Sequence, residues 1–115
     1  MSRSLSLYLN DILKSIAKIE SYVDGLSYDE FCEDERTLDA VTHNLQIIGE
    51  VTKQIPDSIR SKYSQVEWQK IAGLRDIIAH TYFKVNSKIV WSIIQTKLSS
   101  LQNCIELIMN QESLM

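Results

Sequence analysis

The side chains best suited to chemistry lie together between Arg75 and Tyr82. Arg75, Asp76, His80 and Tyr82 give this stretch the form R-x-x-x-x-H-x-Y, and His80 is one of 2 histidines in the chain of 115 residues. An imidazole, whose reference pKa is about 6.5, can take a proton from a 2′-hydroxyl or give one to a leaving 5′-oxygen. A guanidinium group can donate several hydrogen bonds to phosphate oxygens as charge develops on them. These residue types therefore allow metal-free cleavage of RNA to a 2′,3′-cyclic phosphate.

The spacing within this stretch constrains how the groups can meet. On a helix of about 100° per residue, Arg75 and Tyr82 share a face, and Asp76 lies close enough to His80 to hold its imidazole in one tautomer. Arg75 and His80 are about 140° apart on an ideal helix. They converge on one substrate atom only if the helix ends or distorts near His80, or if a symmetry-related copy supplies the second group. A histidine at a helix end also has a simpler role, which is to cap the helix and interact with its dipole.

Other kinds of catalytic site have no counterpart in the sequence. No cluster of carboxylates has the spacing of a divalent-ion site, and there is neither a glycine-rich phosphate loop nor a nucleophilic Ser or Cys elbow. Cys32 and Cys104 are far apart in the chain, which favours two reduced packing cysteines in a cytosolic protein. The sequence therefore predicts no metal ion and no cofactor.

Length and composition predict one all-α domain over residues 1–115. Hydrophobic residues make up 44% of the chain, while 3 glycines and 1 proline leave little turn chemistry, as expected for helices joined by short loops. No apolar run approaches the ~20 residues that span a bilayer, and the first residues do not have the form of a signal peptide. We therefore expect a cytoplasmic protein that does not enter the membrane.

The net charge of −3 conceals an uneven distribution of charged residues. Residues 1–50 carry four basic and ten acidic side chains, whereas residues 51–100 carry eight basic and three acidic ones. A local positive surface can bind a polyanion even on an acidic protein. Ordinary solvated helix faces would give the same counts, so charge alone does not identify a partner.

Apolar periodicity and capping signals predict an antiparallel bundle of four to five helices. One apolar stripe covers residues 5–26, and a second long helix is expected from about residue 35 to residue 54, before Pro56. Capping boxes of the form S-x-x-E at residues 27–30 and 64–67 predict the starts of a short helix and of the helix that carries the motif. Asn86 is the predicted N-cap of a last helix. The stripe of that helix comprises Val90, Ile94, Leu98, Leu101, Ile105 and Ile108.

The second long helix has an additional apolar stripe that includes one amide. This stripe consists of Ala40, Asn44, Ile47 and Val51, and it implies burial against two surfaces, within the bundle or across a dimer. An unpaired amide among apolar neighbours would cost a few kcal/mol, so Asn44 is expected to have a specific hydrogen-bond partner. It is then either a satisfied buried amide or a group that orients Arg75 or a phosphate. Glu50 is a candidate member of the same polar group.

The chain resembles the HepT-like toxins of the HEPN superfamily. The motif from Arg75 to Tyr82 has the form found in that superfamily, and further segments match in the same order. These segments are Tyr28-Asp29-Glu30-Phe31, Asn44-Leu45-Gln46-Ile47-Ile48-Gly49-Glu50, Trp68-Gln69-Lys70-Ile71-Ala72-Gly73-Leu74-Arg75-Asp76 and Ile89-Val90-Trp91. The resemblance covers nearly the whole chain. It departs at His43, where many relatives look more like arginine, and this departure removes a permanent positive charge beside Asn44.

The resemblance implies a metal-independent endoribonuclease toxin that acts as a homodimer on an RNA substrate. Arg75 and His80 match the catalytic pair, and Asp76 fills a position where the superfamily favours a polar residue. Tyr82 matches the tyrosine that a cognate minimal nucleotidyltransferase antitoxin modifies with AMP. Added charge and bulk beside Arg75 would block entry of a phosphate.

Two alternatives to an active ribonuclease remain at this point. In the first, the chain is a non-catalytic helical subunit that binds a nucleotide or substrate for the nucleotidyltransferase. In the second, it is a structural dimerisation module, which the intact motif argues against. The first alternative differs from the ribonuclease in whether Arg75 and His80 do chemistry or only bind.

Overall fold

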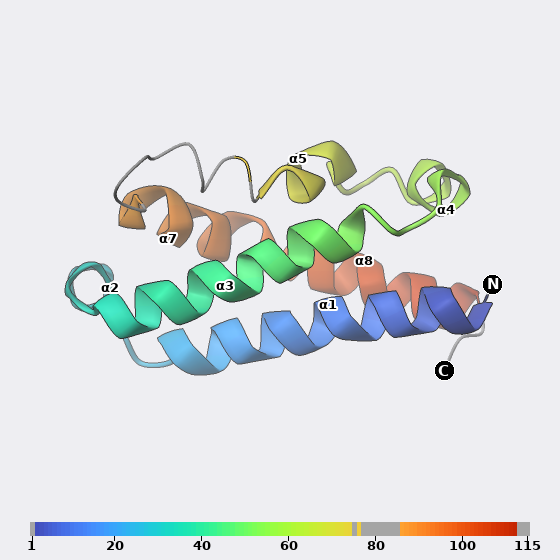
Figure 1. Cartoon of the computed structure of the whole chain (residues 1–115). Coiled ribbons are helices and arrows are strands. Elements are labelled where there is room, and N and C mark those ends of the chain that lie inside the picture. The colour runs from blue at the N-terminus through green and yellow to red at the C-terminus, as the bar shows by residue number, and fades with distance from the viewer. Residues whose placement is uncertain (1, 75, 77–85, 113–115) are drawn as a thin grey trace.

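The computed structural model describes residues 2–74, 76 and 86–112, and these residues form helices and connecting turns (Figure 1). The helices are α1 (Ser2–Val23), α2 (Tyr28–Glu33), α3 (Glu35–Thr52), α4 (Asp57–Lys62), α5 (Trp68–Ala72), α7 (Ser87–Thr96) and α8 (Leu98–Gln111). No strand occurs among the described residues. The predicted all-α class is confirmed.

The core forms where α1 packs between α3 and α8. α1 and α3 run antiparallel and side by side in Figure 1, and α1 also contacts α8. The apolar stripe of α1 is buried along the length of the helix, from Leu9 through Ile12 and Ile16 to Ile19. This spacing of three and four residues places all of these side chains on one helix face. The stripe predicted from the sequence is therefore the main contribution of α1 to the core.

Local capping signals set the boundaries of α2 and the start of α3. The Ser27 hydroxyl accepts from the backbone N–H of Glu30 at 3.2 Å, and the Glu30 carboxylate accepts from the backbone N–H of Ser27 at 2.9 Å. This pair of bonds confirms the predicted capping box. Gly25, at φ 79°, makes the left-handed turn that precedes it. Asp34 then caps α3 by accepting from the backbone N–H of Thr37 at 3.0 Å.

The end of α3 agrees with the expected stop before Pro56. α3 ends at Thr52, two residues before the predicted end, and Pro56 is the N-cap residue of α4. The short helix α4 was not predicted. Its six residues form one and a half turns whose apolar contribution is the buried Ile59, so periodicity in the sequence gives little signal there.

The capping box predicted at residues 64–67 is wrong. α5 begins at Trp68, and its N-cap residue Glu67 makes no side-chain capping bond. The reason is tertiary, because Tyr63 and Val66 are buried and the indole N–H of Trp68 donates to the backbone carbonyl oxygen of Tyr63 at 2.9 Å. These contacts hold residues 63–67 in a turn where a local signal alone predicts a helix.

The predicted last helix is two helices, α7 and α8, separated at Lys97. The Thr96 hydroxyl donates to the carbonyl oxygen of Ser92 at 2.7 Å, a back-bond of the kind that bends helices. Asn86 caps α7 as predicted, because its side chain accepts from the backbone N–H groups of Lys88 and Ile89 at 3.0 and 3.3 Å. The six residues of the predicted stripe are all buried, so the break does not interrupt the core.

Contacts within one chain account for part of the burial of the additional apolar stripe of α3. α3 contacts α1 on one side and also packs against α2, α5 and α7. Asn44 is buried, whereas Ala40, Ile47 and Val51 are half-buried.

Within the described part of the chain, none of the helices is long and apolar enough to cross a membrane.

Candidate active site

The short helix α5 leads into the motif and is fixed by one buried face. Trp68, Ile71 and Leu74 recur every three residues, and all three are buried. α5 packs against α3, and the Trp68 indole is hydrogen-bonded to the Tyr63 carbonyl group. α5, which precedes the motif in the chain, is therefore anchored against α3.

A second polar contact ties the turn before α5 to the end of α8. The Tyr63 hydroxyl and the Lys62 ammonium group each donate to the same oxygen, Oε2 of Glu112, at 2.7 Å. The hydrogen bond from Lys62 is the main reason that the pKa of Glu112 lies below its usual value, with the bond from Tyr63 second. Burial, followed by the bond to Glu112, raises the pKa of Tyr63. The turn before α5 is therefore held against the C-terminal end of α8.

Of the four predicted motif residues, the structure describes Asp76. Its side chain is exposed and follows the buried Leu74 by two positions. Arg75, His80 and Tyr82 lie outside the described residues. The pairing of Asp76 with His80, the convergence of Arg75 with His80 and the position of Tyr82 therefore stay predictions.

Asn44 has a hydrogen-bond partner, as its burial requires. Asn44 is 4% exposed, and its side-chain Nδ2 donates to the backbone carbonyl oxygen of Ala40 at 2.9 Å. Leaving a buried donor unpaired costs about 1–3 kcal/mol, so this bond within α3 removes much of that penalty. Asn44 is therefore a buried amide whose donor nitrogen has a hydrogen-bond partner. A role in orienting Arg75 or a phosphate is still a prediction.

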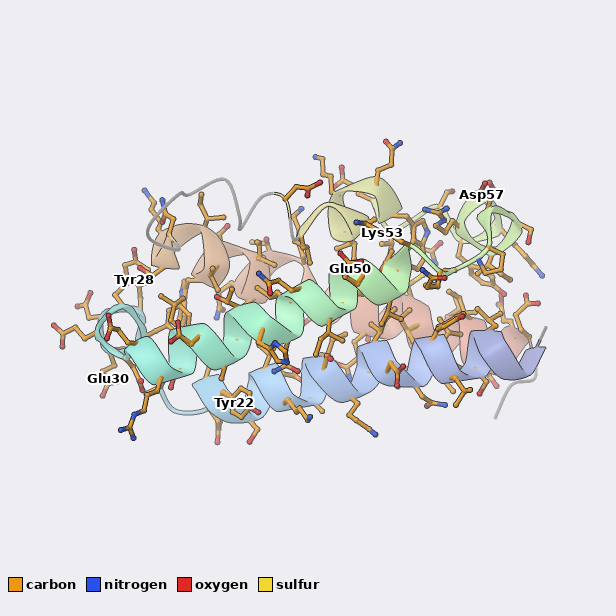
Figure 2. All side chains as sticks on the ribbon, viewed as in Figure 1. Tyr22, Tyr28, Glu30, Glu50, Lys53 and Asp57 are labelled. Carbon is orange, nitrogen blue, oxygen red and sulfur yellow. The ribbon has the colours of Figure 1, made fainter. Side chains whose placement is uncertain are left out.

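Glu50 lies on the C-terminal part of α3 (Figure 2), and it is more exposed than Asn44. The side chain of Glu50 is 46% exposed, and Oε1 accepts from the Lys53 ammonium group at 3.4 Å. A half-exposed carboxylate of this kind can exchange partners at low cost. His43, the position that departs from the family pattern, is also exposed on α3.

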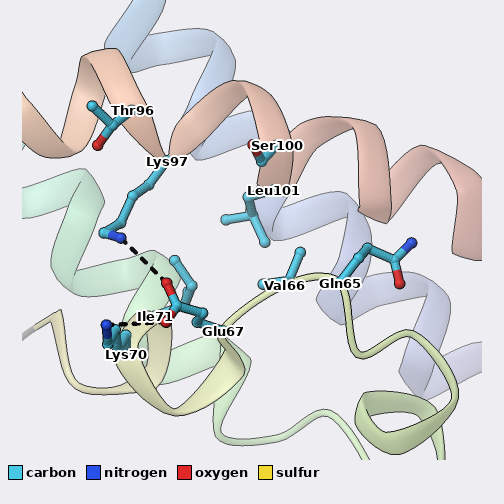
Figure 3. A pocket seen from close by; sticks show the side chains of 9 residues that line it. All are labelled: Gln65, Val66, Glu67, Lys70, Ile71, Thr96, Lys97, Ser100 and Leu101. Atoms are coloured by element: carbon cyan, nitrogen blue, oxygen red, sulfur yellow. Dashed lines mark ion pairs between the residues drawn. The ribbon is translucent and has the colours of Figure 1, made fainter.

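A polar pocket between α5 and the junction of α7 with α8 was not predicted from the sequence. Glu67 of α5's N-terminal turn lies between two lysines there, Lys70 of α5 and Lys97 of the junction (Figure 3). The two lysines are separated by 27 positions in the chain, so no spacing rule relates them. The apolar stripe continues from Ile94 to Leu98 past Lys97, so it gives no local signal of the pocket either.

The described residues contain no group of three or more His, Cys, Asp or Glu side chains arranged to hold a metal ion. Cys32 and Cys104 are both free cysteines, the first exposed and the second buried. Burial raises the pKa of the Cys104 thiol, which favours its neutral form.

Comparisons with known proteins identify the family. The model of the family described as ribonuclease HepT-like matches residues 12–108, a range that includes the whole motif. A protein of Caldanaerobacter subterraneus, named as a candidate RNase, is 36% identical over 105 residues, which are 91% of this chain and 94% of the relative. A protein of Thermococcus cleftensis, named a probable ribonuclease HepT, is 33% identical over 106 residues, which are 92% of this chain and 96% of the relative.

A third relative, from Methanocaldococcus jannaschii and also named as a candidate RNase, is 36% identical over 96 residues, which are 84% of this chain and 79% of the relative. No solved structure matches the chain. The family model covers most of the sequence, and these relatives are aligned over most of their own length. The chain belongs to the ribonuclease HepT-like family.

Proposed function

We propose that this chain is a metal-independent endoribonuclease in which Arg75 and His80 do the chemistry. The observation that carries the proposal is the family match over residues 12–108, within which the arginine and histidine of the motif are both present. The names of the relatives as RNases support the same reading. The described fold is consistent with it, because α5, which precedes the motif in the chain, packs against α3.

In this mechanism His80 takes the proton of the 2′-hydroxyl, or protonates the leaving 5′-oxygen, and Arg75 donates to the phosphate oxygens. Asp76 would hold the imidazole of His80 in one tautomer. The 2′-oxygen forms the new bond to phosphorus as the bond to the 5′-oxygen breaks, so the product is a 2′,3′-cyclic phosphate. Asn44 and Glu50 are supporting residues on the adjacent helix α3, and no metal takes part.

The biological role that we propose is that of a toxin paired with a minimal nucleotidyltransferase antitoxin in the cytoplasm. The antitoxin would attach AMP to Tyr82, where a phosphate beside Arg75 would exclude RNA. We further propose a homodimer, with both motifs near the two-fold axis, and one domain over residues 1–115. Arg75 and His80 are about 140° apart on an ideal helix, and this separation supports a site that is completed at such an axis.

The test of the activity is cleavage of a labelled single-stranded RNA by the purified protein in the presence of EDTA. We expect products that end in a 2′,3′-cyclic phosphate, identified by mass spectrometry. The alternative of a non-catalytic nucleotide-binding subunit predicts that the protein binds RNA or nucleotide and leaves the RNA intact. Intact RNA together with measurable binding would therefore replace the enzyme proposal with the binding one.

A further inference from the structure

The pocket between α5 and the α7–α8 junction has the size of a site for one small charged group. Its volume is about 120 Å³, which is below the roughly 300–1,000 Å³ of pockets that enclose whole small molecules. Residues from two stretches of the chain line it: Gln65, Val66, Glu67, Lys70, Ile71, Thr96, Lys97, Ser100 and Leu101. The pocket is partly open to solvent, so a group attached to a larger molecule can enter it.

Two lysine ammonium groups in this pocket share one carboxylate. Lys70 Nζ is 3.0 Å from Glu67 Oε2, and Lys97 Nζ is 3.6 Å from Glu67 Oε1 (Figure 3). The three side chains together carry one net positive charge. The second distance exceeds that of a normal hydrogen bond, and an ammonium group has three donors. Lys97 therefore has donors that Glu67 does not use.

Glu67 is held weakly enough to be exchanged for another anion. Its side chain is 61% exposed, and ion pairs between exposed groups add little to stability because water and salt screen them. The bond from Lys70, with Lys97 contributing less, lowers the pKa of Glu67. The group is therefore an anion at neutral pH, and it competes for the lysines with any anion that enters. Rotation of Glu67 into the solvent would leave two cations facing the pocket.

Two further polar side chains match an oxyanion with several acceptor oxygens. Gln65 and Ser100 place an amide and a hydroxyl on the wall, and both groups can donate. The Thr96 hydroxyl already donates to the carbonyl oxygen of Ser92 at 2.7 Å, so it does not donate into the pocket. Ammonium, amide and hydroxyl donors around a small space are the groups that bind phosphate.

We propose that this pocket binds a backbone phosphate of RNA through Lys70 and Lys97, and that Glu67 is its resident competitor. The proposal rests on the proposed ribonuclease function, since it assigns the same substrate to a second contact. Lys70 is five residues before Arg75 in the chain, on the helix that leads into the motif. We expect the phosphate bound in the pocket to fix the register of an RNA strand that is cleaved at the motif.

The experiment measures the binding of a fluorescent single-stranded RNA by anisotropy in the His80→Ala background, so that cleavage does not interfere. We expect Lys97→Gln and Lys70→Gln each to weaken binding roughly fivefold at low salt, and to reduce the slope of log Kd against log salt by about 0.7. Glu67→Gln removes the competitor and keeps the side-chain shape. It should tighten binding by a similar factor, whereas loss of a merely structural clamp would weaken binding.

Matched controls separate the pocket from the charge of the whole protein. Lys18→Gln on α1 and Glu106→Gln on α8 change the same formal charges at exposed positions outside the pocket. We expect each to leave Kd within twofold of the parent protein, and circular dichroism melts should show that all variants are folded. The proposal is overturned if Glu67→Gln weakens binding or leaves it unchanged, or if Lys97→Gln behaves like Lys18→Gln.

Two competitors identify the source of the phosphate. Inorganic phosphate and ATP are added to the RNA complex of the parent protein and of Glu67→Gln. Displacement only at concentrations far above that of the RNA supports a backbone phosphate, while displacement by ATP at RNA-like concentrations overturns RNA as the ligand. Because binding is read without cleavage, failure of the proposed enzyme activity would be seen in the cleavage assay alone.

Discussion

The indole N–H of Trp68 donates to the backbone carbonyl oxygen of Tyr63 at 2.9 Å, and both residues are buried. This bond closes the turn that precedes α5 with a contact between the first residue of α5 and the C-cap residue of α4. A buried carbonyl group without a donor would carry a desolvation cost. The bond therefore contributes to fixing where α5, the helix that precedes the motif in the chain, begins.

Replacement of the indole tests this anchor. Trp68→Phe keeps an aromatic side chain but leaves the Tyr63 carbonyl group without its donor, and it makes the side chain smaller. We expect the free energy of unfolding to fall by about 2–3 kcal/mol, from the unpaired carbonyl and the lost packing. Urea unfolding followed by circular dichroism measures the change. A loss below about 0.5 kcal/mol would show that water or a shifted backbone replaces the bond.

The acid sensitivity of the fold gives a second test, at Glu112. The pKa of Glu112 is lowered from the reference value of 4.5 by Lys62 first and Tyr63 second, so its folded-state pKa lies below its unfolded-state pKa. Such a group stabilises the fold above the unfolded pKa, and this contribution is lost as the pH falls through the folded pKa. We expect Glu112→Gln to make stability less dependent on pH below about 4.5.

Unfolding in urea at neutral pH and at several pH values below 4.5 measures this dependence. Glu106→Gln changes the same formal charge on the same helix and controls for net charge. A Glu112→Gln profile as steep as that of the unmodified protein would contradict the assigned role of the contact with Lys62 and Tyr63.

The catalytic assignment predicts the behaviour of two alanine variants. Arg75→Ala and His80→Ala should each lower the rate of RNA cleavage by at least about 100-fold, the usual contribution of a positioned general acid–base or charge-stabilising group. Their melting temperatures should stay close to that of the unmodified protein if both groups line a cleft. EDTA should have little effect. Cleavage that requires a divalent ion would exclude the metal-free mechanism.

The dimer proposal is tested by sedimentation at micromolar concentration. We expect the mass of two chains of 13.3 kDa each. Mixing Arg75→Ala with His80→Ala should restore part of the activity if the two groups of one site come from different copies. A monomer that cleaves RNA at the full rate would disprove the requirement for a second copy.

Control by the antitoxin is tested at Tyr82. Co-expression with the cognate nucleotidyltransferase should add one or more AMP units, each about 329 Da by chemical arithmetic, and suppress toxicity through the contact between the added phosphate and Arg75. Tyr82→Phe should abolish the added mass and leave the chain toxic in the presence of the partner. The full mass shift in Tyr82→Phe would place the modification on another residue.

Local signals in the sequence predicted those parts of the fold that local interactions determine. Ser27 and Asn86 cap their helices as expected, because each needs only the next three residues to make its bonds. Ser64 fails as a helix start because Tyr63 and Trp68 close a turn around it through tertiary contacts. The break between α7 and α8 at Lys97 could not be predicted from periodicity, because the buried residues on both sides of it continue one apolar stripe.

The two candidate sites differ in how well they could be predicted from the sequence. Arg75 and His80 were found because their types and spacing lie within one short stretch of chain. The pocket of Lys70 and Lys97 depends on packing between residues that the sequence separates, and two lysines in a protein with 12 Lys and Arg residues give no signal by themselves. Only the contact of both with Glu67 distinguishes them from other surface lysines.

The position of α1 between α3 and α8 determines when the newly made chain can mature. As the ribosome extends the polypeptide from its N-terminus, α3 can cover one side of α1 early, but α8 follows only from residue 98. The nascent chain thus carries a partly uncovered apolar stripe until residue 111 has emerged. Burial of the α1 stripe thus waits for a helix that begins at residue 98, so the core is completed by contacts that are distant in sequence.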